Sequence, residues 1–234
     1  MLILATDSAI RSCSAALCDN GTITSTAQEN TPNRQAERLL LLTNQVLKEQ
    51  NKDYSSIDLL VSTIGPGSFT GLRIALAATQ GISLANNIPV CGITTLQAMA
   101  QGYQKHYQNQ PKASLSIIID ARRDNVFFQR FSSENNCLIA QSDALMLTIE
   151  QLPQNINSDD IIVSNCPDLL TGSLTPPLHG NIFSTSVTPD AASAALFAHN
   201  HYNKENTTTY PSLTPLYIRP PDAIIPKKVY TSQS

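Results

Sequence analysis

Residues 65–73, GPGSFTGLR, have the residue types and spacing that most favour a chemical site in this sequence. They follow an apolar run and precede an alanine-rich run, so we expect a strand to end in this loop and a helix to begin there. The dipole and the free backbone N–H groups at the start of a helix attract anions. The loop is therefore a candidate phosphate site, and its candidate residues, with an aspartate that ends the first predicted strand, are Asp7, Gly65, Gly67, Ser68, Thr70, Gly71 and Arg73.

The spacing of the glycines matches neither of two common nucleotide-binding loops. No lysine follows Gly71, as GxxxxGK[ST] requires, and three residues separate Gly67 from Gly71, where GxGxxG has two. The alternative is a tight strand-to-helix turn, in which Gly71 allows close packing and Ser68 or Thr70 caps the helix. The residues alone leave both interpretations open.

Two aspartates, Asp7 and Asp120, stand at the ends of predicted strands. Such carboxylates either lie near Mg²⁺ and phosphate or accept hydrogen bonds from their own backbone in Asx turns. The four histidines, at positions 106, 179, 199 and 201, have no second histidine or carboxylate at a spacing suited to a catalytic metal. The sequence also lacks the GxSxG and HExxH motifs.

The elements that must position these residues follow from periodicity. Alternating and β-branched runs predict strands, Asp19-Asn20-Gly21 predicts a hairpin turn, and apolar residues at helical spacing predict helices. In chain order we expect strands at 2–6, 12–18 and 22–27, a helix at 34–50, a strand at 57–64, a helix at 70–86, a strand at 89–93 and a helix at 94–107. This order, βββαβαβα, predicts a mixed sheet covered by helices.

The pattern then begins again. The segments ILATDSAIRSCSAAL and SIIIDARRDNVFFQR each hold an apolar strand, an aspartate, a short polar turn with arginine and an alternating strand. A duplicated βββαβα unit is typical of the α/β actin-like ATPase (ASKHA) fold, in which two lobes flank a nucleotide cleft; coincidence is the alternative. We expect one lobe at 1–108 and a truncated second lobe at 109–234, whose last segment packs back on the first.

Composition argues against several functions. The chain has 234 residues, a formal net charge of −3 and no Lys/Arg cluster longer than a doublet, so we expect no direct grip on nucleic acid by the chain alone. The five scattered cysteines are typical of free thiols in a reducing compartment. No apolar stretch approaches the roughly 20 residues that a membrane span needs. We expect a cytoplasmic protein without a membrane segment.

The predicted helix at 70–86 carries many small side chains on and around one face, among them Ala75, Ala78 and Gly81. Small residues let a second helix approach closely. That second helix belongs either to this chain or to a partner, and the residues do not decide between them.

Four segments together resemble one protein family, the bacterial TsaB (YeaZ) family. They are the opening LILATDSAIRSCSAAL, GPGSFTGLRIALAATQGISLA, IDARRDNVF and the late LTPLYIRPPDA, spread over nearly the whole length. The resemblance implies a two-lobed actin-like fold and a role in making threonylcarbamoyl-adenosine (t6A) at position 37 of ANN-decoding tRNAs. It also implies that the chain is not itself an enzyme, but an inactive paralogue and scaffold of the catalyst TsaD.

The resemblance further implies the partners and the surface that binds them. We expect a heterodimer with TsaD, TsaE in an ATP-dependent complex, an alternative homodimer, and only indirect contact with tRNA. The partner-binding residues implied on the helices at 34–50 and 70–86 are Arg34, Arg38, Leu42, Leu72, Ala75, Ala78, Thr79 and Ile82. The glycine loop then becomes a vestigial phosphate loop. We expect no metal and no cofactor, and weak ATP or ADP binding stays open.

Two other functions remain as alternatives. One is an actin-like ATPase or phosphotransferase that acts alone, with Mg²⁺ held by Asp7 or Asp120. The other is a metallopeptidase. TsaD-like proteins carry an HxxxH metal motif in the leading helix, whereas the matching stretch here, NRQAERL, has no histidine, which argues against the metallopeptidase.

Overall fold

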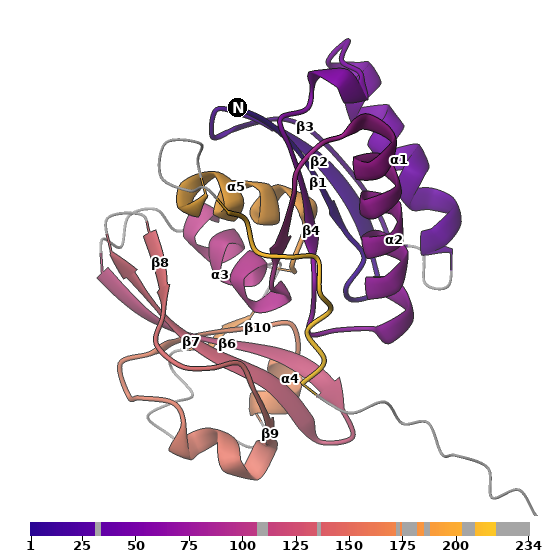
Figure 1. Cartoon of the computed structure of the whole chain (residues 1–234). Coiled ribbons are helices and arrows are strands. Elements are labelled where there is room, and N and C mark those ends of the chain that lie inside the picture. The colour runs from indigo at the N-terminus through magenta and orange to yellow at the C-terminus, as the bar shows by residue number, and fades with distance from the viewer. Residues whose placement is uncertain are drawn as a thin grey trace, which may run out of the picture.

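The computed structural model describes residues 1–30, 34–106, 112–134, 137–171, 174, 182–184, 188–202 and 209–218. Its fold is a mixed α/β arrangement of two sheets, one above the other in Figure 1, with helices between them and on the outer face of the first sheet. The boundary that we predicted between residues 108 and 109 lies outside the described residues.

The first sheet has the strand order β3-β2-β1-β4-β5. β1 to β3 form an antiparallel meander, and β4 and β5 run parallel to β1. The predicted hairpin turn is confirmed, since Asn20 and Gly21 both have positive φ angles. The five strands are β1 (Leu2–Asp7), β2 (Cys13–Asp19), β3 (Thr22–Glu29), β4 (Leu59–Thr63) and β5 (Val90–Ile93).

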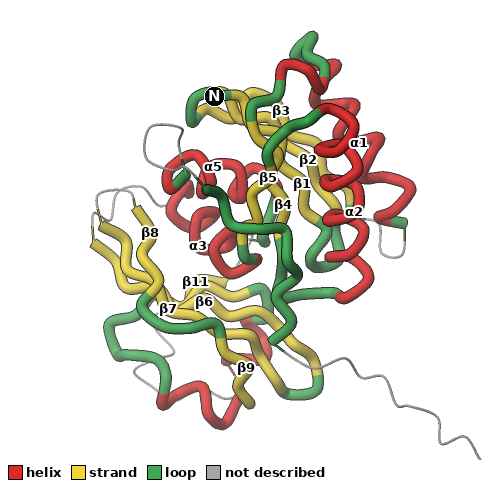
Figure 2. Tube along the Cα trace, viewed as in Figure 1, coloured by secondary structure: helices red, strands yellow, loops and turns green. Residues whose placement is uncertain are grey.

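Helices bury both faces of this sheet (Figure 2). α1 (Gln35–Glu49) and α2 (Phe69–Asn86) cover one face, and α5 (Ala191–His201) covers the other, with α3 (Thr95–His106) packed between α5 and the second sheet. Successive side chains of a strand point to opposite faces. Leu4 of β1 therefore packs under α1 and α2, whereas Ala5 packs under α5. Two buried faces explain why every residue of β1 and β4 is buried, whereas the edge strand β3 is polar and largely exposed.

The second sheet repeats this topology with the order β11-β10-β6-β7-β8. β8 pairs with the last residues of β7, and β9 pairs with its first residues. As in the first sheet, an antiparallel meander is followed by two strands parallel to its first member, so the predicted internal repeat is confirmed. The strands are β6 (Lys112–Arg122), β7 (Asn125–Glu134), β8 (Cys137–Ala140), β9 (Leu145–Thr148), β10 (Ile161–Ser164) and β11 (Ile182–Ser184).

The described helices between the second lobe's strands are short. In chain order, the 3-10 helix η2 (Ile149–Gln154) occupies the position that α1 has in the first lobe, and α4 (Pro167–Thr171) occupies the position of α2. The remaining short helix, η1 (Tyr54–Ser56), belongs to the first lobe and precedes β4. Their small apolar cluster packs on the outer face of the second sheet. Among the described residues, the helices between the second lobe's strands are therefore shorter than those of the first lobe.

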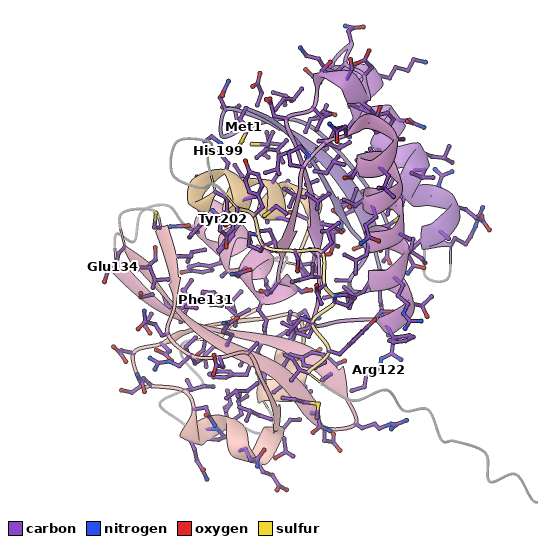
Figure 3. All side chains as sticks on the ribbon, in the orientation of Figure 1. Met1, Arg122, Phe131, Glu134, His199 and Tyr202 are labelled. Carbon is purple, nitrogen blue, oxygen red and sulfur yellow. The ribbon has the colours of Figure 1, made fainter. Side chains whose placement is uncertain are left out.

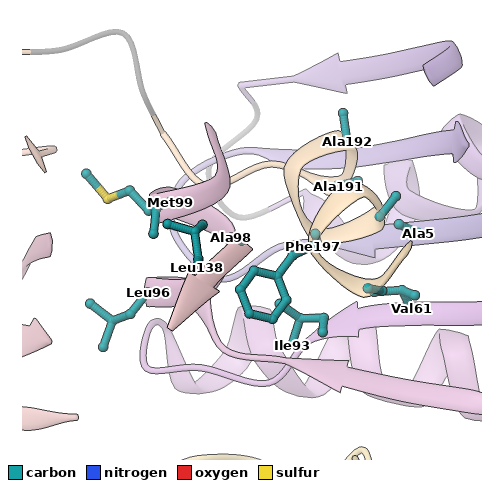
Figure 4. Packing of buried hydrophobic residues seen from close by; sticks show 14 of the residues in the cluster. Ala5, Val61, Ile93, Leu96, Ala98, Met99, Leu138, Ala191, Ala192 and Phe197 are labelled. Atoms are coloured by element: carbon teal, nitrogen blue, oxygen red, sulfur yellow. The ribbon is translucent and has the colours of Figure 1, made fainter. Parts of the chain in front are cut away.

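The end of the described chain returns to the first lobe. In Figure 4, Phe197 of α5 lies beside Val61 and Ile93, and all three side chains belong to the core that α3 and α5 share with both sheets. Residues 209–218 then run along the first sheet. The N–H of Gly92 donates to the carbonyl of Pro211 at 2.8 Å. None of the described helices has both the length and the apolar character that crossing a bilayer requires.

Candidate functional site

A cleft of about 1110 Å³ lies where the two lobes meet. Most of its lining comes from the turn after β1, the glycine loop before α2, the end of β6 and residues 216–218, with smaller contributions from the end of β3, β7 and the segments after β10 and β11. The described residues that line it are Ala9, Ile10, Arg11, Ser12, Gln28, Asn30, Pro66, Gly67, Ser68, Phe69, Thr70, Ile119, Asp120, Ala121, Arg122, Phe127, Asn165, Thr188, Leu216, Tyr217 and Ile218.

The glycines of the loop permit close contact between two backbone segments. A Cβ on Gly67 would lie 2.2 Å from the carbonyl oxygen of Ala9, and one on Gly71 would lie 2.1 Å from that of Ser8. The N–H of Ser68 donates to the Ala9 carbonyl at 2.7 Å, and the Ser8 hydroxyl donates to the Gly71 carbonyl at 2.6 Å. The loop is thus fastened to the turn that follows β1.

The start of α2 also fits the alternative of a tight strand-to-helix turn with a side-chain cap. The side chain of Ser68 accepts a hydrogen bond from the N–H of Gly71 at 3.2 Å, so Ser68, and not Thr70, is the N-cap. Gly65 has a φ of +109°, and a Cβ there would lie 2.8 Å from the carbonyl oxygen of Leu216. This glycine therefore admits the returning segment 209–218 beside the loop.

Asp7 lies behind this contact and does not line the cleft. Its side chain is 1% exposed, its Oδ1 accepts from the Thr63 hydroxyl at 2.5 Å and from the N–H of Ala9 at 3.2 Å, and its Oδ2 has no partner among the described residues. Burial raises the pKa of this carboxyl to about 7, against the opposing effect of the Thr63 bond, and nearby Asp190 adds to the rise. A buried group of this kind favours the neutral acid.

Asp120 differs from Asp7, because it is exposed and lines the cleft. Its Oδ1 accepts from the N–H of Arg122 at 2.7 Å, and its own N–H donates to Asn165 Oδ1 at 2.9 Å. Both aspartates therefore accept a hydrogen bond from the residue two positions on, which is the Asx turn that the sequence leaves as the alternative. The structure does not bring the two carboxylates together in the cleft.

Arg73 and Thr70 complete the predicted loop residues. Thr70 is exposed at the cleft, but the Arg73 guanidinium lies over the ring of Phe69, 3.8 Å from its centroid, and its Nε donates to the Tyr217 hydroxyl at 3.4 Å. Among the described residues, no three histidine, cysteine or acidic side chains are grouped so that they could hold a metal ion.

The prediction of partner-binding residues is wrong for five positions. All five are at most 9% exposed, because they form the sides of α1 and α2 that pack on the first sheet; they are Leu42, Leu72, Ala75, Thr79 and Ile82. Thr79, for example, shares a 2.9 Å hydrogen bond with Thr6. Of the other three, Ala78 is half-buried, Arg34 pairs with Glu37, and Arg38 pairs with Glu29.

Different residues of the same helices are exposed, and the sequence reasoning missed them. Leu40 and Leu41 of α1 are 46% and 52% exposed, and Leu84 of α2 is 86% exposed. A Cβ on Gly81 would meet nothing within 4 Å. The signal was present in the sequence, since these leucines fall outside the apolar set that the helical spacing assigns to the core. We call Leu40, Leu41, Gly81 and Leu84 the apolar helix face.

Known proteins match this chain by sequence and by fold. Residues 28–209 match the family model of TsaD, tRNA N6-adenosine threonylcarbamoyltransferase. The tRNA threonylcarbamoyladenosine biosynthesis protein TsaB of Escherichia coli is 34% identical over 58% of this chain, and TsaB of Buchnera aphidicola is 30% identical over 67% of it. The chain belongs to the TsaB (YeaZ) family. The alignment spans 57% of the E. coli relative, little more than half its length, and 70% of the Buchnera relative.

The fold of this TsaB-family chain also has a solved counterpart. The structure of YeaZ from Pseudomonas aeruginosa matches it with a TM-score of 0.78 at 24% identity, over 92% of this chain and 99% of that one. The two-lobed arrangement is that of the actin-like ATPases, as the repeated strand order predicted. In this TsaB-family chain the predicted phosphate loop is a packed turn beside an open cleft.

Proposed function

We propose that this chain acts in tRNA threonylcarbamoyladenosine biosynthesis as a non-catalytic scaffold that binds and activates TsaD. The names of its TsaB relatives support the pathway. The match to the TsaD family model supports a paralogous partner of similar fold. The observation that carries the scaffold role is the apolar helix face, which the chain leaves open to solvent.

The apolar helix face has the geometry of a helix-packing surface. On α2, Gly81 stands four residues after the exposed Ala77 and three before Leu84, so these residues lie on one side of the helix. The small side chains let a partner helix approach, and Leu84 and Leu41 supply apolar area to bury. Two helices from each protein then form a four-helix bundle.

The cleft favours the scaffold over an ATPase that acts alone. Asp7 is shut away behind Ser8 and Ala9, and Asp120 already accepts a backbone N–H. The backbone of the glycine loop is in contact with protein at Gly67 and Gly71. These positions serve packing, and we propose that they no longer serve catalysis. Steady ATP hydrolysis by the isolated chain, measured by phosphate release, would contradict this part of the proposal.

TsaD is the partner that we propose for the apolar helix face, and a second copy of this chain is its competitor there. TsaE would join the TsaD complex with ATP. Because one face cannot hold both partners, the homodimer must dissociate before the heterodimer forms. Weak nucleotide binding in the cleft remains compatible with this role.

The test is association with the TsaD of the same organism, followed by size exclusion with light scattering. We expect a 1:1 complex with the native chain and its loss with Leu84→Glu. Ile139→Glu is the matched control, since Ile139 is an exposed apolar residue, 47% accessible, on β8 of the other lobe. A complex that survives Leu84→Glu would move the partner surface elsewhere, and no complex with the native chain would overturn the proposed function.

A further inference from the structure

An exposed cation–aromatic cluster lies at the mouth of the cleft. The Arg73 guanidinium covers one face of the Phe69 ring at 3.8 Å, and the rings of Phe69 and Tyr217 are tilted at 35° with centroids 5.4 Å apart. Phe69 and Tyr217 are each 43% exposed, and both line the cleft. Aromatic side chains normally bury most of their surface, so two exposed rings beside a cavity indicate a candidate binding site.

The cluster is held in place by backbone contacts. Phe69 begins α2 directly after the N-cap Ser68, and the N–H of Leu216, next to Tyr217, donates to the carbonyl of Ile64 at 2.7 Å. The two rings therefore come from distant parts of the sequence but are fastened to the same lobe. A binding platform needs such positions to be fixed before the ligand arrives.

The charges around the cleft are mostly positive. Arg11 lies in the turn after β1, and Arg122, labelled in Figure 3, ends β6 of the second lobe; both are exposed and line the cleft. Asp120 is the one carboxylate among the described lining residues, and its Oδ1 accepts the N–H of Arg122. With Arg73 at the mouth, three separate segments each contribute an arginine.

We propose that this rim binds unpaired RNA nucleotides, with bases stacked on Phe69 and Tyr217 and phosphates held by Arg11 and Arg122. Single-stranded nucleic acid is recognised by aromatic platforms beside guanidinium groups. The inference rests on the proposed function, because the RNA that this pathway supplies is a tRNA with an unpaired anticodon loop. It differs from the expectation of only indirect tRNA contact that the family resemblance implies.

The experiment measures binding of a fluorescently labelled anticodon stem–loop RNA to the full chain by anisotropy. We expect the stem–loop to bind at least tenfold more tightly than a fully paired duplex of equal length. Phe69→Leu keeps an apolar side chain but removes the ring, and should weaken stem–loop binding roughly tenfold, while Phe69→Tyr should restore it. Arg122→Gln should lower the slope of log K against log salt by about 0.7 for each phosphate that the variant no longer neutralises.

Lys52→Ala is the control for charge, because Lys52 is an exposed cation that follows α1 away from the cleft. It should leave binding unchanged. Equal affinity for the duplex, unchanged binding by Phe69→Leu, or competition by AMP or ADP at the same concentration as the stem–loop would each overturn the proposal; the last would make the rim a mononucleotide site. Failure here leaves the TsaD complex intact, whereas failure of the proposed function abolishes that complex, so the two are distinguishable.

Discussion

The imidazole of His199 lies directly against Gly21, where a Cβ would come within 2.7 Å of His199 Nε2. The contact joins the last turn of α5 to the hairpin between β2 and β3, close to the chain's first residue (Figure 3). Gly21 has a φ of +81°, and the α-amino group of Met1 donates to the side chain of Asn20 beside it. One small residue therefore lets three segments meet.

Gly21→Ala should destabilise the protein by about 1–3 kcal/mol. A left-handed backbone conformation costs an L-residue roughly 1–2 kcal/mol, and the new methyl group must displace the imidazole. Gly81→Ala is the matched control, because that glycine is helical and has open space around it. It should stabilise the helix by about 0.5–1 kcal/mol. Urea unfolding measures both, and equal effects would contradict the contact.

Asp7→Asn should stabilise the protein more at high pH than at low pH. The folded-state pKa is raised to about 7 from the ordinary 3.8, so the folded protein holds a proton that the unfolded chain releases. Stability therefore falls as pH rises from about 4 to 7, and the cost persists above 7. Removing the ionisable group should yield about 1–4 kcal/mol at pH 8 and little at pH 4. A pH-independent effect would show that Asp7 does not titrate there.

Asp160→Asn should change the stability with the opposite sign: it should destabilise the protein, and more at neutral pH than at low pH. Asp160 is 0% exposed; burial opposes its ionisation, but hydrogen bonds from Arg130 at 2.9 Å and from Ser114 and Ser116 outweigh this and hold its pKa below the usual value. Its contribution is present above the unfolded-state pKa and is lost as pH falls through the lower folded-state pKa.

The substitution leaves Arg130 without its carboxylate, so we expect a loss of about 3 kcal/mol at pH 7. That loss should shrink toward pH 2, where the native carboxyl is protonated as well. Thermal or urea unfolding at both pH values gives the comparison. Because Asp7 and Asp160 are both buried aspartates, each serves as the control for the other, and slopes of the same sign would contradict one of the two assignments.

Ala75→Glu and Leu84→Glu should separate stability from association. Ala75 is 0% exposed, and a buried unpaired carboxylate there should unfold the chain or destabilise it by several kcal/mol. Leu84 is 86% exposed, so its substitution should change the melting temperature little while abolishing the TsaD complex. Circular dichroism and size exclusion measure the two properties. A stable Ala75→Glu protein that fails to associate would restore the original prediction for that residue.

Local signals predicted much of the first lobe. The Asn20-Gly21 turn depends on a few neighbouring residues and is confirmed, and Ser68 is one of the two caps that the sequence left open for α2. The Asx turns of Asp7 and Asp120 are also local, and the sequence left them open as the alternative to a place near Mg²⁺ and phosphate. β9, η2 and β11 were missed, because short segments have too few residues to show a period.

The partner residues could not be assigned from pattern alone. A small apolar side chain such as Ala75 fits a subunit interface and a helix–sheet contact equally well, and only the position of the sheet decides between them. The sequence indicated Arg73 as a candidate anion-binding residue but could not group it with Arg11 and Arg122. The three arginines are far apart in the sequence, so the turns of both lobes are needed to bring them to one rim.

The position of α5 also determines the order in which the molecule can be made. The helix is encoded after the whole second sheet, yet Phe197 and its alanines fill the core of the first. When only the segment from β1 to α3 has left the ribosome, the first sheet therefore still has one apolar face without its covering helix α5. Contacts so distant in sequence form slowly, and domains ordinarily fold as they emerge. Here the first lobe is synthesised first, but its core can be completed only after the second lobe and α5 have been synthesised.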